Sequence, residues 1–194
     1  MLLYRYILGG NILKKFFKFG CLGLIALVVL IIVLAIVFSG DDDKVSTGAD
    51  GKAKTSETTA AKKDDGSKKV DASSVTAEEV GLKIGLGEVK ITKNKIQVGI
   101  NLENTNDQVV MFYPDQGSAV VGDMQLEANL FLTDGNIGGE IQGGVKQDGI
   151  IEFLAPEGKQ ITVDDIKEIK LALGDVVSED FTQSKAVNLT IEVK

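Results

Sequence analysis

The sequence predicts an all-β fold for residues 77–194, an antiparallel β-sandwich of seven to nine strands. The clearest evidence is the segment KIQVGINLEN, in which Ile96, Val98 and Ile100 alternate with polar residues or glycine. This period of two places the aliphatic side chains on one face of a strand. Similar short runs recur between clusters of Gly, Asn and Asp, a spacing that favours a sandwich over a βαβ arrangement. The 118 residues are enough for one core.

The chain begins with a basic stretch, residues 1–18, which we expect to lie in the cytoplasm. Residues 19–38 follow, and none of these 20 residues is charged. A helix of this length spans about 30 Å, which matches the hydrocarbon thickness of a bilayer. We therefore expect residues 19–38 to form a single transmembrane helix, a signal anchor in the cell membrane.

The charges beside this segment predict its orientation. Arg5, Lys14, Lys15 and Lys18 precede it with no acidic residue among them, and basic residues are retained on the cytoplasmic side. The N-terminus should lie inside and the C-terminal domain outside. The alternative is a signal peptide cleaved near Ser39, which would give a secreted protein. Cys21 precedes the apolar core, so it does not fit a lipoprotein signal.

Residues 39–76 have the composition of a disordered linker. Asp, Lys, Thr, Ser, Ala and Gly dominate, and the larger aliphatic residues are only Val45, Val70 and Val75. Such a segment buries too little apolar surface to offset the entropy of ordering the chain. We expect a flexible tether between the helix and the domain at 77–194, which would be extracytoplasmic.

The strands of this domain follow from local patterns. We expect a register slip near Gly87 in the first strand, and in the fifth we expect Leu130 and Leu132 to face inward. Asp134–Asn136 and Ala155–Gly158 should be turns, and Asp164–Glu168 is the only helical candidate. The expected strands, in chain order, are Leu86–Thr92, Lys95–Asn104, Val109–Phe112, Ser118–Val121, Met124–Leu132, Gly149–Leu154, Ile166–Leu173 and Val187–Val193.

Composition and charge exclude several classes of function. Residues 77–194 contain ten lysines against twenty acidic residues, a net charge of −10. Such a domain repels phosphate backbones, so we expect no nucleic-acid partner. The chain has no histidine and one cysteine, which excludes Ser/His/Asp, Cys/His and His-based zinc sites. We therefore expect no enzyme, no cofactor, and no catalytic, cofactor-binding or metal-binding residues.

Acidic clusters leave one alternative open. Asp164 with Asp165, and Asp175 with Glu179 and Asp180, could act as an acid and base or bind calcium. Solvated loop acids are the commoner case, and Asp134–Asn136 lacks the ligand pattern of an EF-hand. The glycines of GLKIGLGE and GNIGGEIQGG do not open a helix, so bends and bulges explain them better than phosphate loops.

The aromatic composition argues against a sugar-binding function, because the domain has no tryptophan. We expect most of its aromatic side chains in the core, and Tyr113 before Pro114, at the end of an expected strand, is the one candidate for exposure. The aromatic residues of the domain are Phe112, Tyr113, Phe131, Phe153 and Phe181.

The tripeptide Asn188–Thr190 matches the N-glycosylation motif but lies in the last expected strand.

Two motifs, INLENTND and GGVKQDGIIEFLAPEG, follow a basic start, a hydrophobic helix and a polar tether. This order resembles an uncharacterised family of immunoglobulin-like extracytoplasmic domains that are anchored to the membrane of Gram-positive bacteria. The resemblance covers about residues 80 to 194. It implies an immunoglobulin-like fold and an extracytoplasmic location but no activity, and it places Ile150, Ile151 and Phe153 inward.

The sequence thus predicts a non-enzymatic, membrane-anchored module that acts by contact with an envelope or protein partner. A secreted or tethered β-sandwich that binds a small ligand or a cation such as calcium is the alternative.

Overall fold

The computed structural model describes residues 45–49 and 66–194, which belong to one compact unit, Val45–Lys194. This unit is all-β, and every strand pairing in it is antiparallel, as predicted. The basic N-terminus, the expected helix at 19–38 and most of the expected linker lie outside the described residues. Among the residues that are described, no helix is both long and apolar enough to cross a bilayer.

The described residues form twelve strands rather than seven to nine, because four strands of three or four residues, β1, β2, β8 and β9, join the eight that the sequence predicts. Two short 3-10 helices, η1 (Pro114–Gln116) and η2 (Val163–Asp165), accompany them. The strands are β1 (Lys68–Asp71), β2 (Thr76–Glu79), β3 (Leu82–Ile91), β4 (Lys95–Asn104), β5 (Val110–Phe112), β6 (Ser118–Val121), β7 (Met124–Ala128), β8 (Asp134–Asn136), β9 (Gly139–Ile141), β10 (Lys146–Leu154), β11 (Glu168–Ser178) and β12 (Ser184–Glu192).

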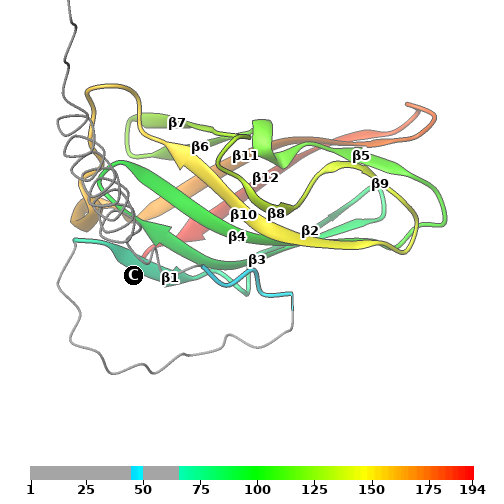
Figure 1. Ribbon diagram of the computed structural model, residues 1–194, viewed down its shortest axis with the longest axis horizontal. Helices are drawn as coiled ribbons and strands as arrows, with labels where there is room; N and C mark the ends of the chain where they lie inside the picture. Colours follow the sequence, from blue (N-terminus) through cyan, green and yellow to red (C-terminus); the bar gives the residue numbers. More distant parts are fainter. Residues whose placement is uncertain (1–44, 50–65) are drawn as a thin grey trace, which may run out of the picture. The chain divides into compact units, whose positions relative to one another are not determined.

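Hydrogen bonds connect the strands into a sheet that folds over on itself. Its order is β1-β3-β4-β10-β7-β6-β11-β5-β9, with β2 beside β3, β8 beside β10 and β12 beside β11. β10 pairs with β4 along its length but with β7 only at Phe153 and Leu154. The sheet passes there from the layer of β3, β4 and β10 to the layer of β6, β11 and β12, which gives a sandwich-like arrangement (Figure 1).

The core lies between these two layers. The alternation in β4 is confirmed, since Ile96, Val98 and Ile100 are fully buried. Phe153 of β10 and Leu171 of β11 are also buried, and they belong to the same apolar cluster. The resemblance placed three residues of β10 inward, and all three are buried, although Ile150 is outside this cluster. Burial of aliphatic side chains at about 25 cal/mol per Å² supplies the main stabilisation of such a core.

A β-bulge interrupts β3 where the sequence predicts a register slip. Leu86 pairs with Ile100 and Val89 with Val98, so Gly87 and Glu88 together oppose the single residue Gly99. A bulge leaves one residue of the ladder without its regular partner and redirects its backbone groups.

Two segments are strands where the sequence predicts a turn and a linker. Asp134–Asn136, expected as a turn, is strand β8 and pairs with β10, because Gly135 lies close against the backbone of Asp148 and Gly149. The sheet begins at Lys68, inside the span whose composition indicates a linker, because β1 pairs with β3 from Lys68 to Asp71. Pairing with an apolar strand supplies order that the composition of β1 does not reveal.

Candidate interaction site

Three consecutive apolar side chains project from the turn that follows β7. Leu130 is 51% exposed, Phe131 87% and Leu132 49%. We call Leu130–Leu132 the apolar turn. Single exposed apolar residues are common on protein surfaces, whereas a contiguous group of large ones is a candidate for an interaction site.

The conformation of the apolar turn is set by Asn129. Its side-chain Oδ1 accepts a hydrogen bond from the Phe131 N–H at 3.0 Å, and its carbonyl oxygen accepts one from the Leu132 N–H at 3.0 Å. The Thr133 hydroxyl donates to the same carbonyl at 3.2 Å. The Asn129 N–H donates to Glu152 O at 2.8 Å, which ties the turn to β10. The exposed side chains are therefore held on an ordered scaffold.

The sequence prediction for this segment was wrong. The alternation from Met124 to Leu132 predicts one strand with Leu130 and Leu132 facing inward, but β7 ends at Ala128. An asparagine that bonds its own backbone two residues on favours a turn over a strand. Asn129 is the signal that the alternation hid.

The aromatic residues divide between core and surface. Phe112 and Phe153 are fully buried, as expected. Tyr113, before Pro114, which the sequence singles out as the candidate for exposure, is 46% exposed. Phe131 and Phe181, expected in the core, are exposed by 87% and 75%. Both lie in turns that the sheet holds away from the core.

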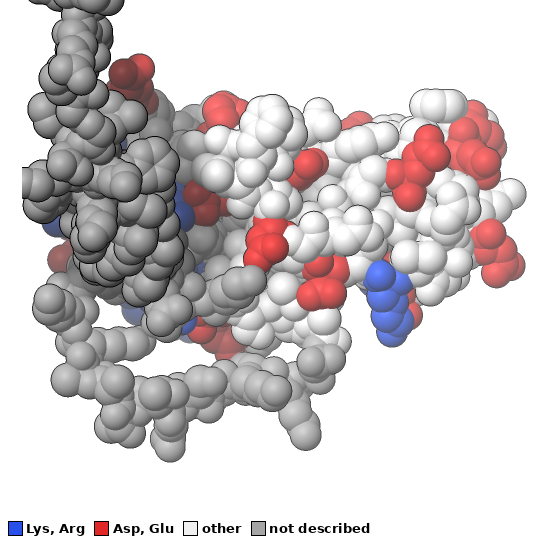
Figure 2. Space-filling view, in the orientation of Figure 1, with Lys and Arg blue, Asp and Glu red and all other residues white. Residues whose placement is uncertain are grey.

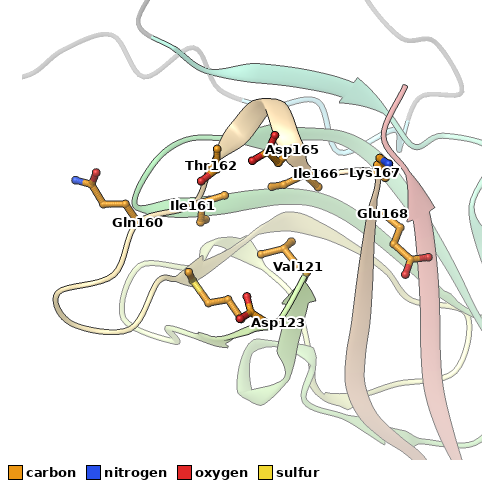
Figure 3. A pocket seen from close by; sticks show the side chains of 11 residues that line it. Val121, Asp123, Gln160, Ile161, Thr162, Asp165, Ile166, Lys167 and Glu168 are labelled. Carbon is orange, nitrogen blue, oxygen red and sulfur yellow. The ribbon is translucent and has the colours of Figure 1, made fainter.

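A cleft of about 510 Å³ lies between the β6–β7 turn and residues 160–168. Its floor is apolar, and its rim carries the side chains of Asp123, Asp165 and Glu168 (Figure 3). Asp164, adjacent in sequence to Asp165, lines a different cavity beside Lys68 and Lys93. The two carboxylates therefore line different cavities.

The second acidic cluster serves the β11–β12 hairpin. Asp180 Oδ1 accepts hydrogen bonds from Ser178 Oγ at 2.7 Å, from Thr182 N–H at 3.1 Å and from Thr182 Oγ1 at 2.8 Å. The Ser178 hydroxyl, followed by the Thr182 donors, lowers the pKa of Asp180 below its ordinary value. Asp175 Oδ2 accepts from Ser184 Oγ at 2.7 Å. These carboxylates are engaged in turn formation.

Metal and glycan sites gain no support. In the described part of the chain, no three Asp, Glu, His or Cys side chains are grouped so that they could hold a metal ion. Asn188 and Thr190 both lie in β12, where the ladder with β11 holds the backbone extended.

The charge of the domain is visible on its surface. Figure 2 shows acidic side chains in scattered groups on the visible face, with few basic ones among them. Three of the acids in the described residues form exposed ion pairs: Glu103 with Lys146 at 3.2 Å, Glu168 with Lys170 at 3.0 Å and Glu192 with Lys194 at 3.8 Å. Such exposed pairs contribute little to stability, so the acidic excess is mainly a property of the surface.

These observations define an all-β, antiparallel, sandwich-like domain with an acidic surface and an ordered apolar turn. No family model matches the chain, and no curated protein matches it. Three of the similar solved structures come from the Gram-positive bacteria Listeria and Bacillus. A Listeria monocytogenes protein of unknown function has a TM-score of 0.48 and 14% identity, covering 66% of this chain and 88% of its own.

Two Bacillus subtilis proteins are also similar. The ycdA protein, provisionally described as a lipoprotein, has a TM-score of 0.43 and 13% identity, covering 63% of this chain and 39% of its own. The yjhA protein has a TM-score of 0.40 and 9% identity, covering 61% of this chain and 96% of its own. Similarity at this level carries no inference about function.

Proposed function

We propose that the chain is a membrane-anchored extracytoplasmic protein whose β-sandwich, immunoglobulin-like in type, acts without catalysis by binding a protein partner in the cell envelope. The observation that carries this proposal is the apolar turn. Three large apolar side chains are held in water by a hydrogen-bonded scaffold, an arrangement that folding of the domain does not require.

The chemistry of the turn favours a protein over a lipid surface. Exposed aromatic and aliphatic side chains form the centre of many protein interfaces, where they fill pockets on the partner. Anionic lipids attract basic segments, whereas residues 77–194 have a net charge of −10. A partner with an apolar pocket, bordered by basic residues that complement the acidic domain, fits these properties.

Membrane anchoring rests on the uncharged segment 19–38 and the basic residues before it. Protease added to intact cells should digest the C-terminal domain while the N-terminus stays protected. If the protein is instead cleaved near Ser39, the mature N-terminus determined by mass spectrometry will identify a secreted form. Protection of the domain in intact cells combined with its digestion in lysates would refute the extracytoplasmic location.

The contact itself is tested by placing a photocrosslinking amino acid at position 131 in intact cells. The matched control carries the same amino acid at position 181, where the native phenylalanine is 75% exposed on a different hairpin. We expect a protein adduct at position 131 that Leu130→Ser with Leu132→Ser reduces at least tenfold. Equal adducts at positions 131 and 181, or none at 131, would refute the role of the apolar turn.

A further inference from the structure

The segment Val45–Ala49, which we call the strap, lies on the outer face of β3, β4 and β10. The Ser46 carbonyl oxygen accepts a hydrogen bond from the Glu88 N–H at 2.7 Å, and the Thr47 carbonyl oxygen accepts one from Asn101 Nδ2 at 2.8 Å. The Thr47 hydroxyl donates to Asp148 Oδ2 at 3.0 Å. Each of the three strands therefore contributes one contact to the strap.

The bulge in β3 creates the first of these contacts. Gly87 and Glu88 oppose Gly99, so the Glu88 N–H is released from the β3–β4 ladder and bonds the strap instead. Asn101 and Asp148, which hold Thr47, are cross-strand partners. Partners in a ladder point to the same face of a sheet. The polar contacts thus converge on one strip of the outer face.

Glycines make room for the strap. A Cβ atom on Gly87 or on Gly99 would clash with the Ser46 carbonyl oxygen. Neither glycine has a positive φ, so other residues could adopt its backbone conformation. Glycine weakens a strand interior and often marks the close approach of another backbone. The close approach of the strap accounts for glycine at both positions.

We infer that this glycine-lined groove is a binding site for an extended peptide segment, and that the strap is its occupant within the same chain. Among the described residues, the folded domain therefore begins at Val45 and not at Lys68. Val45 is only 4% exposed, which agrees with a docked segment and not with a solvated linker.

One consequence rests on the proposed membrane anchor. Between Phe38 and Val45 lie only residues 39–44, a stretch that spans at most about 25 Å when fully extended. A free linker over residues 39–76 would have a mean reach of about 30–36 Å and a much longer maximum. The docked strap therefore limits how far from the membrane the domain can work.

The strap is tested in the purified full-length chain in detergent solution by residue-resolved amide exchange of Glu88. Deletion of residues 45–48 should accelerate this exchange at least tenfold, because the Glu88 N–H loses its acceptor. Deletion of residues 55–58, which has the same length, is the matched control and should leave the exchange unchanged. Unchanged exchange after deletion of residues 45–48 would overturn the inference.

A second variant separates loss of the strap from general damage. Gly99→Ala should also accelerate the exchange of Glu88 and lower the Tm of the intact chain. In the chain lacking residues 45–48, the same substitution should leave the exchange unchanged and should not lower the Tm, because alanine suits a strand better than glycine. An equal loss of Tm in both backgrounds would overturn the inference. Protease protection of the domain in intact cells would refute the proposed function and the limit on the distance between domain and membrane. It would not bear on the docking of the strap.

Discussion

Asn104 Nδ2 lies 2.9 Å from the carbonyl oxygen of Ile141, so a fully buried amide at the end of β4 holds β9, which follows much later in the chain. The same nitrogen donates to Gln108 O at 2.8 Å, and Asn104 Oδ1 accepts the Asn106 N–H at 3.0 Å. The Asn-rich motif INLENTND thus does more than end a strand. It connects the two layers of the sandwich through one satisfied polar side chain.

Asn104→Leu should lower the free energy of unfolding by about 2–4 kcal/mol, because the buried bond to the Ile141 carbonyl oxygen and the part-buried bonds to Gln108 O and Asn106 N–H are lost. Urea denaturation measures this loss. Asn188→Leu is the matched control, since Asn188 is an exposed strand asparagine on β12, and it should change stability by no more than about 0.5 kcal/mol. Equal effects of the two substitutions would contradict the role assigned to the buried amide.

Phe181→Asn should raise the free energy of unfolding by about 0.5–1 kcal/mol. Phe181 has a φ of +58° and is 75% exposed, so it bears left-handed backbone strain without compensating burial. Asparagine tolerates this conformation far better than a bulky residue does. Thermal unfolding measures the gain. Phe131→Asn, at an exposed phenylalanine without positive φ, should give no comparable gain, and an equal gain there would refute the strain argument.

The tip of the β11–β12 hairpin should loosen in acid. The pKa of Asp180 is lowered from its ordinary value of 3.8, first by the Ser178 hydroxyl and then by the Thr182 donors. A lowered folded-state pKa gives stability that is present above the unfolded value of 3.8 and is lost as the pH falls through the folded value. The pKa of Asp71 is also lowered, first by the Ser73 side chain and then by the Ser73 N–H, so its contribution to stability has the same pH dependence.

Carboxyl titration by NMR should therefore give midpoints below 3.8 for Asp180 and Asp71. Exchange of the Thr182 amide should accelerate as the pH drops through the midpoint of Asp180. Asp180→Asn should abolish that acid-dependent step. A midpoint for Asp180 above 3.8 would contradict the hydrogen-bonded turn.

A partly buried ion pair joins β4 to β10. Glu152 is 6% exposed, and its Oε2 accepts hydrogen bonds from Lys95 Nζ and Gln97 Nε2, both at 2.9 Å. Lys95→Met should cost about 1–2 kcal/mol of stability, because the carboxylate keeps its desolvation cost and loses its cation; the partial exposure of Lys95 keeps the loss below that of a fully buried pair.

The double variant Lys95→Met with Glu152→Leu should recover most of the stability that Lys95→Met loses. A double-mutant cycle by urea denaturation measures this coupling. If the stability losses of Lys95→Met and Glu152→Leu added up to the loss of the double variant, the two side chains would not interact. Glu103→Leu with Lys146→Met provides the matched control, because that pair is exposed and should show almost no coupling.

The all-β class, the position of β4 from Lys95 to Asn104 and the slip near Gly87 could be predicted from the sequence. These features depend on alternation and on residues near one another in the chain, which directly set the local backbone conformation. The absence of histidine and the acidic balance of the domain are likewise properties of composition alone.

The tertiary structure decided the rest. The short strands β1, β2, β8 and β9 are stabilised by the neighbours with which they pair, and their own residues carry little signal. Leu130–Leu132 alternates like a strand, yet Asn129 turns it outward. Docking of Val45–Ala49 over Gly87 and Gly99 joins residues far apart in sequence. Whether an apolar or a polar segment is buried depends on which surface it meets in the folded chain, and that surface is assembled only when distant strands pair.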